Sequence, residues 1–182
     1  MHVLAVVLLL LATYAMALLF PEPTTLEQGS TVLGLNEDFT ITWSSESPIL
    51  DDLRSASERL KIALLANRHY YLSVPRGREF LDDQVLVLPG IDIVLNGPNP
   101  DSIASEMTKE ARSRRESYEL DVPADGSFAR LTAESSLGAF RGLTTFEQLF
   151  YGIPVSENAC VWRNIFGSTS NALFSLKTRD LY

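Results

Sequence analysis

Residues 116–151, ESYELDVPADGSFARLTAESSLGAFRGLTTFEQLFY, contain the clearest structural signals in the chain and decide the fold. At 116–122 apolar and acidic residues alternate, which is typical of a strand with one buried face. The tetrapeptide PADG at 123–126 predicts a turn, because proline presets φ and Gly126 tolerates positive φ. The segment 128–133 is then the returning strand of a hairpin.

An amphipathic helix is expected directly after this hairpin. Either Ser135 or Ser136 can cap its N-terminus, because a serine hydroxyl accepts a hydrogen bond from a backbone N–H of the first turn. The apolar residues that follow recur at three- and four-residue spacing: Leu137, Phe140, Leu143, Phe146, Leu149 and Phe150. This spacing predicts a helix with one apolar face.

The same residues resemble the end of the N-terminal, non-catalytic domain of fungal β-N-acetylhexosaminidases of glycoside hydrolase family 20. That family shows a D/E-E-S-Y-x-L strand, a D-G turn and a G-x-x-R-G-L-x-T-F-x-Q-L helix. The corresponding residues are Glu116-Ser117-Tyr118, Asp125-Gly126, and Gly138 with the run 141–149. A second resemblance lies at 19–23, where LFPEP is similar to the L-W-P-x-P opening of mature members.

The resemblance implies an α+β fold, in which an antiparallel or mixed β-sheet has two helices packed on one face, as in the zincin-like N-terminal domain of hexosaminidases. It assigns residues 18–151 to that domain. No match is found at 152–182, where family members have a D-x-P-x-F/Y-x-x-R-G segment that opens the catalytic barrel. Arg163 lies in W-R-N rather than R-G, so the substrate-binding role of the family arginine is not assigned to it.

The preceding part of the chain predicts a strand and a helix. Phe39, Ile41 and Trp43 alternate with threonines and predict the first strand of the sheet. A serine and a proline at 47–48 predict the start of a helix that ends near Asn67.

Several other segments leave alternatives open. The segment 69–74 fits an edge strand or an extended loop. The β-rich runs 85–88 and 91–95 fit one interrupted strand or a hairpin. The segment 101–115 is expected to be a solvated surface loop, although its arginines also fit a basic contact or a dibasic processing site; these are Arg112, Arg114 and Arg115.

Length, charge and the N-terminus limit the class of protein. The chain has 182 residues, room for one ordinary domain, and a formal net charge of -8, which argues against nucleic-acid binding. Residues 1–17 predict a signal peptide cleaved near Ala17, and therefore a secreted protein; the alternative is an uncleaved signal anchor. The single cysteine, Cys160, cannot form an internal disulfide, and the sequence does not assign it a role.

The sequence predicts no catalytic, cofactor-binding or metal-binding residue. Family 20 enzymes use a neighbouring Asp-Glu pair, with the substrate acetamido group as nucleophile, in a barrel context of H-x-G-x-D-E type that this chain lacks. Its adjacent carboxylates, at 37–38, 51–52 and 82–83, are interpreted as helix-end or loop residues. A zinc site is not predicted, because H-E-x-x-H is absent and the histidines are His2 and His69.

The last helix supplies the candidate site residues Arg141, Gly142, Phe146 and Phe150, for docking on a catalytic barrel. The alternative is that they pack on their own sheet, which an amphipathic stripe favours for the phenylalanines and leaves open for Arg141. The resulting hypothesis is the non-catalytic domain of a β-N-acetylhexosaminidase, inactive alone and partnered in cis by a barrel. The alternatives are an interaction module that docks a separate barrel or binds carbohydrate, and a truncated product that folds poorly.

Overall fold

The computed structural model describes residues 19, 23–28, 33–45, 48–65, 86–98, 100–156, 159–164 and 172–177, and side chains as far as residue 150. The predictions for 1–17, 69–74 and 82–83 lie outside these residues. No helix in the described part of the chain is long and apolar enough to cross a bilayer.

The described strands form one eight-stranded mixed sheet, in the order β1-β8-β4-β5-β3-β2-β7-β6. Parallel pairing joins β2 to β3 and β3 to β5, whereas the remaining pairs are antiparallel. The strands are β1 (Thr25–Gln28), β2 (Leu33–Ser45), β3 (Leu86–Leu95), β4 (Tyr118–Pro123), β5 (Ala129–Ala133), β6 (Phe150–Ser156), β7 (Ala159–Asn164) and β8 (Ala172–Lys177).

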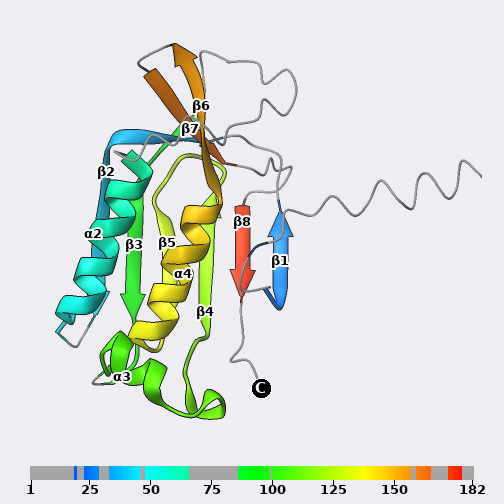
Figure 1. Ribbon diagram of the computed structural model, residues 1–182. Helices are drawn as coiled ribbons and strands as arrows, with labels where there is room; N and C mark the ends of the chain where they lie inside the picture. Colours follow the sequence, from blue (N-terminus) through cyan, green and yellow to red (C-terminus); the bar gives the residue numbers. More distant parts are fainter. Residues whose placement is uncertain are drawn as a thin grey trace, which may run out of the picture.

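Two helices, α2 (Asp51–Leu65) and α4 (Ser136–Gln148), cover one face of the central strands (Figure 1). Each follows a parallel strand and starts at the same end of the sheet, so the two run in the same direction. The short helix α3 (Ile103–Thr108) and the 3-10 turn η2 (Ala111–Ser113) lie across that end. The predicted α+β class, with two helices on one face of a mixed sheet, is confirmed.

The hairpin of β4 and β5 has the predicted turn. Tyr118 pairs with Ala133 and Asp121 with Arg130, and Gly126 has a φ of 77°, which a residue without Cβ adopts without a steric penalty. The two runs around Pro89-Gly90 form the single strand β3, in which the pairing with β2 shifts register. The interrupted strand, rather than the hairpin, is therefore the correct alternative.

The core lies between the helices and the sheet. Phe39 of β2 stacks on Phe146 of α4 with ring centroids 5.9 Å apart, and both side chains are fully buried. Burying each such aromatic side chain contributes about 1.5–3 kcal/mol relative to exposure. The alternation that predicted a buried face thus places Phe39 of β2 and Tyr118 of β4 against α4.

Three expectations need correction. β2 is not the first strand, because β1 precedes it and lies at the sheet edge. The segment 101–115 is not simply a solvated loop, because it contains α3 and a buried glutamate. Beyond residue 150 the chain continues as β6, β7 and β8, and β8 lies between β1 and β4. No strand was predicted there, since the family motif used as a guide ends before it.

Candidate docking site

The N-terminus of α4 is fixed by one serine hydroxyl. Ser135 is the N-cap: its Oγ accepts a hydrogen bond from the backbone N–H of Gly138 at 2.9 Å and donates one to the carbonyl of Arg115. The hydroxyl of Ser136 is also buried but has no hydrogen-bond partner. The cap therefore resolves the choice that the sequence left open and ties the helix to the segment before β4.

Two glycines allow α4 to lie close to the sheet. A Cβ at Gly138 would overlap the backbone carbonyl of Ser117, and a Cβ at Gly142 would overlap the side chain of Leu131 in β5. For Gly138 the close neighbour is therefore a backbone group of the same domain. The spacing of four residues between the two glycines places both on the sheet-facing side of the helix.

The structure also places the other candidate docking residues. Phe146 is fully buried, whereas Phe150, predicted on the same helix, is instead the first residue of β6 and is 6% exposed. Their ring centroids are 5.0 Å apart in the core of this domain. Arg141 is partly exposed, and its Nε lies 3.1 Å from Oε2 of Glu116. Both aromatic rings thus pack within the core of this domain. Contact of this helix with a barrel stays a prediction, and Arg141 is the member of the set with part of its side chain at the surface.

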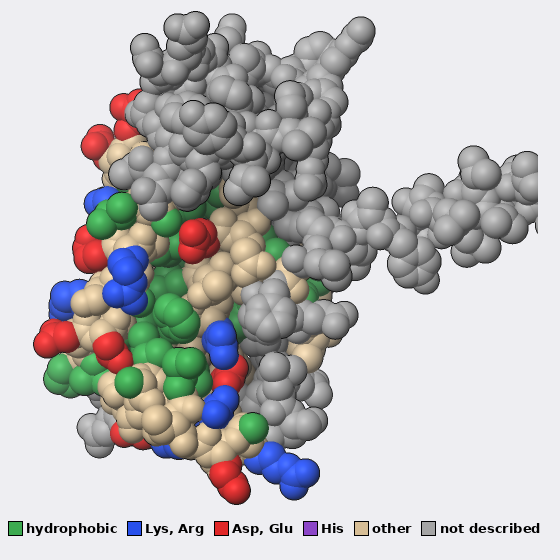
Figure 2. All heavy atoms as spheres, in the orientation of Figure 1, with side chains coloured by type: hydrophobic (Ala, Val, Ile, Leu, Met, Phe, Trp, Pro, Cys, Tyr) green, Lys and Arg blue, Asp and Glu red, His purple; other side chains and the backbone are tan. Residues whose placement is uncertain are grey.

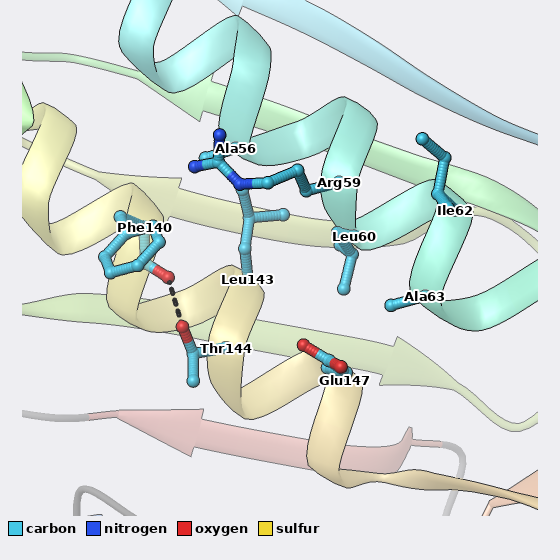
Figure 3. A pocket seen from close by; sticks show the side chains of 9 residues that line it. All are labelled: Ala56, Arg59, Leu60, Ile62, Ala63, Phe140, Leu143, Thr144 and Glu147. Carbon is cyan, nitrogen blue, oxygen red and sulfur yellow. Dashed lines mark hydrogen bonds between the residues drawn. The ribbon is translucent and has the colours of Figure 1, made fainter. Parts of the chain in front are cut away.

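A groove between α2 and α4 was not predicted. It has a volume of about 400 Å³, and we call it the α2–α4 groove; it is lined by Ala56, Arg59, Leu60, Ile62, Ala63, Phe140, Leu143, Thr144 and Glu147 (Figure 3). Figure 2 shows hydrophobic side chains at the surface between the two helices, with basic and acidic side chains beside them. Ile62 is the most exposed large apolar residue of the described chain, at 53%.

One signal in the sequence points to this groove. The apolar stripe of the first helix contains Leu53, Leu60 and Leu64, which the structure buries against the sheet. Ile62 falls outside that stripe, and an isoleucine on the polar side of a helix needs a separate explanation. Ile62 and Arg59 lie on the first helix, whereas the docking residues predicted from the sequence lie at the last helix.

A buried carboxylate lies at the end of the sheet. The Glu106 side chain is fully buried, and its Oε1 lies 2.9 Å from Nζ of Lys109 and 3.1 Å from Nη2 of Arg115. Burial opposes ionisation, but hydrogen bonds from these two cations outweigh it and hold the pKa of Glu106 below its ordinary value. Lys109 also pairs with Asp101 at 2.8 Å. Ion pairs with two cations give Glu106 a structural role.

The adjacent carboxylates have structural partners or exposed positions. Asp52 accepts hydrogen bonds from the backbone N–H groups of Leu53 at 2.8 Å and of Ile103 at 2.6 Å, so it joins α2 to α3. Glu37 and Asp38 are exposed on β2. The helix-end interpretation of Asp51 and Asp52 agrees with this position. Glu37 and Asp38 are solvated as expected, but they lie within a strand and not in a loop.

Asp121 is a carboxyl group whose surroundings disfavour ionisation. Burial raises its pKa, and the charge of Glu119, two residues away on the same strand, raises it further. Both side chains point to the face of the sheet opposite the helices, because Tyr118 and Leu120 face α4 and the core. Neither lines the α2–α4 groove. Among the described residues no group of three or more His, Cys, Asp or Glu side chains is arranged to hold a metal ion.

The described part of the chain is thus a two-layer α+β domain, with helices packed closely on the sheet, a groove between them and carboxylates in structural contacts. The sequence matches the family described as "beta-acetyl hexosaminidase like" over residues 19–149, which is more than half of the chain. The chain therefore belongs to this family.

A solved structure shows the same fold. A chitobiase of Flavobacterium johnsoniae is similar with a TM-score of 0.50 and 18% identity, and the match covers 89% of this chain and 20% of that chain. An exo-β-N-acetylglucosaminidase of glycoside hydrolase family 20 from Vibrio harveyi gives a TM-score of 0.47 and 18% identity, over 88% of this chain and 18% of that chain. The chain thus spans about a fifth of the length of these enzymes. No curated protein sequence gives a significant match.

Proposed function

We propose that this chain is the N-terminal, non-catalytic domain of a β-N-acetylhexosaminidase that hydrolyses terminal, non-reducing N-acetylhexosamine residues, as in chitin breakdown. The observation that carries the proposal is the family match over 19–149, on a fold similar to one-fifth of a chitobiase. The motifs at 116–118 and 138–149 are of the type found in fungal members. By itself the polypeptide has no hydrolytic activity, and its partner is a catalytic barrel in cis.

The described carboxyl groups support inactivity. Hydrolysis of a glycoside needs an acid with a raised pKa next to a second carboxylate in a closed sugar pocket. Glu106, the fully buried carboxylate, has a lowered pKa because Lys109 and Arg115 stabilise its charge. Asp121 has a raised pKa but lies on the sheet face opposite the helices, beside the exposed Glu119. Neither environment meets both conditions.

The partner part of the proposal is tested by sequencing complementary DNA across and beyond the codon for Tyr182. We expect transcripts that carry, in frame, a D-x-P-x-F/Y-x-x-R-G segment followed by an H-x-G-x-D-E segment. Transcripts that all terminate without either segment, from a locus that encodes neither, would contradict a barrel in cis. They would favour the alternative, a secreted module that docks a separate barrel or binds carbohydrate.

Secretion is the second part of the proposal. It rests on the apolar run in residues 3–12 and the small-x-small site Ala15-Met16-Ala17. Expression in a eukaryotic host should release a protein whose N-terminus, read by mass spectrometry, begins at or near residue 18. A cell-associated protein that retains residue 1 would instead identify a signal anchor.

A further inference from the structure

We propose that residues 112–115 are the recognition site of a protease specific for paired basic residues, which cuts the bond between Arg115 and Glu116. Glu106 restrains this cleavage in the folded chain, because it holds both ends of the connection between α3 and β4. The inference concerns processing of the chain and not hydrolysis of a glycoside. Of the proposed function it uses only secretion, as the route on which the chain meets such a protease, and its test with purified protein does not depend on that route.

The sequence RSRR at 112–115 has the residue types that such a protease recognises. Carboxylates in the subsites of the protease bind the arginines that precede the cut, because a guanidinium group pairs well with a carboxylate. Residues 114–115 are the only adjacent pair of basic residues in the sequence. Four of its 15 lysines and arginines lie at 109–115, in a chain with a net charge of -8. The connection is therefore a local basic site that an acidic protease cleft attracts.

This site lies in a connection outside the two layers of the fold. η2 lies across the end of the sheet from which α2 and α4 start (Figure 1), and Figure 2 shows basic side chains at the surface of this end. No residue of η2 is buried, and Arg112 and Ser113 are exposed. Arg114, the next residue, has φ -79° and ψ 130°, an extended conformation of the kind that peptides adopt when they bind along a protein strand. Exposed connections are preferred sites of proteolysis.

The fold accounts for two of the three arginines at this site. Arg115 pairs with Glu106, and Nε of Arg114 donates to the carbonyl of Lys109 at 2.9 Å. Arg112 is exposed and makes no ion pair within the described part of the chain. Packing therefore does not require a cation at position 112, whereas recognition of the RSRR sequence does. This makes Arg112 the residue that distinguishes recognition from a structural role.

Glu106 holds the connection at both of its ends. Its Oε1 lies 2.9 Å from Nζ of Lys109, just after α3, and 3.1 Å from Nη2 of Arg115, just before β4. The carbonyl of Arg115, which belongs to the bond to be cut, accepts the hydrogen bond from Ser135. A protease has to take both the side chain and the carbonyl of Arg115 into its own active site. The contacts with Glu106 and Ser135 therefore have to break before the bond is cut.

Cleavage then proceeds from a locally open state of residues 109–116. In that state the protease serine attacks the carbonyl carbon of Arg115, the nitrogen of Glu116 leaves with a proton as a new N-terminal amine, and one water releases the Arg115 carboxylate. Exposed connections open locally at a lower free-energy cost than global unfolding. When opening and closing are faster than cutting, the rate of cleavage follows the population of the open state. Weakening the contacts of Glu106 should therefore accelerate cleavage.

Recognition is tested by incubating the purified, folded chain with a purified subtilisin-type protease specific for paired basic residues, and by following the products with mass spectrometry. The first products should be one fragment that ends at residue 115 and one that begins at residue 116. Arg112→Ala should lower the rate of this cut roughly tenfold, because one charge-assisted contact with the protease is lost, and should leave the melting temperature unchanged. An intact wild-type chain, a first cut elsewhere, or an R112A variant that is cut as fast as wild type would overturn the proposal.

The restraint by Glu106 is tested with three variants under the same conditions, each shown to be folded by circular dichroism. Glu106→Gln should accelerate the cut about tenfold, because it weakens the contacts with Lys109 and Arg115. Glu110→Gln, which is exposed in the same connection, should leave the rate at the wild-type value. Gly142→Ala, which destabilises the fold away from this connection, should also leave it unchanged. Equal acceleration in E106Q and G142A would mean that cutting follows global unfolding and would contradict the restraint, as would a wild-type rate in E106Q.

Discussion

Ser135 and Ser136 are adjacent, buried and chemically identical, yet their hydroxyls have opposite energetic roles. The Ser135 hydroxyl both accepts from the N–H of Gly138 and donates to the carbonyl of Arg115. The Ser136 hydroxyl is buried without a partner, which costs desolvation energy with no hydrogen bond in return. The pair therefore offers a test of the cap in which each variant is the control for the other.

Ser135→Ala should lower the free energy of unfolding by about 1–2 kcal/mol, because it removes an N-cap and leaves two backbone groups unpaired. Ser136→Ala should change it by less than about 0.5 kcal/mol or increase it, because only an unsatisfied group is lost. Chemical denaturation of the two variants measures both values. Equal destabilisation by the two substitutions would contradict the assigned cap.

Glu106 should make the stability of the chain depend on pH. Because the folded-state pKa is lowered, its ionised form stabilises the fold above the unfolded-state pKa, and this stability is lost as the pH falls through the folded-state pKa. Glu106→Gln should cost about 2 kcal/mol at neutral pH, less than a fully buried pair, because Lys109 and Arg115 are partly exposed.

Unfolding of the E106Q variant, measured across the acidic range, should show a weaker loss of stability with falling pH than the wild-type chain. Glu110→Gln is the matched control, since Glu110 lies in the same segment and is exposed. It should leave both the neutral-pH stability and the pH profile near those of wild type. A steep acid profile retained in E106Q would place the responsible group elsewhere.

At the scale of elements, the distance between α4 and β5 is set by Gly142 and Leu131. Gly142→Ala should destabilise the chain by about 1–2 kcal/mol, since overlap with the fully buried Leu131 outweighs the gain in helix propensity. Leu131→Val shortens the side chain that a new Cβ would meet.

The double variant G142A/L131V tests this contact by denaturation. It should be less destabilised than the sum of the two single variants, with a coupling of about 1 kcal/mol. Strict additivity would show that the close approach does not set the position of the helix. Gly138→Ala has no such rescue, because it meets the backbone carbonyl of Ser117, and it should destabilise the chain more than G142A.

Elements with strong local signals were predictable from the sequence. The β4–β5 hairpin, α2 and α4 follow from alternation, helical spacing and turn chemistry. Their observed bounds lie within two residues of the predicted ones, except that α2 begins at Asp51, three residues after the proline predicted to open it. The extent of β3 across Pro89-Gly90 was not decided, because a proline and a glycine signal either a turn or an irregular strand. Pairing with the neighbouring strands shows that β3 is one irregular strand.

At the scale of the whole molecule, the sequence did not predict which strands pair when they are far apart in the chain. Parallel pairing of β2 with β3, and insertion of β8 between β1 and β4, depend on residues that are far apart in the chain. The burial of Glu106 is not predictable from its charged segment, because it depends on Arg115 and on the packing of α3 against α4. The α2–α4 groove likewise exists only once both helices lie on the same face of the sheet.

The central claim is that a supporting domain of the hexosaminidase family has no hydrolytic activity of its own. The most direct measurement is turnover of an aryl N-acetylglucosaminide by the purified chain, with an intact family 20 enzyme as the positive control. We expect release of the aryl group at the rate seen in buffer alone. Activity that co-purifies with this polypeptide, and that is lost when Asp121 or Glu119 is replaced by its amide, would contradict the claim.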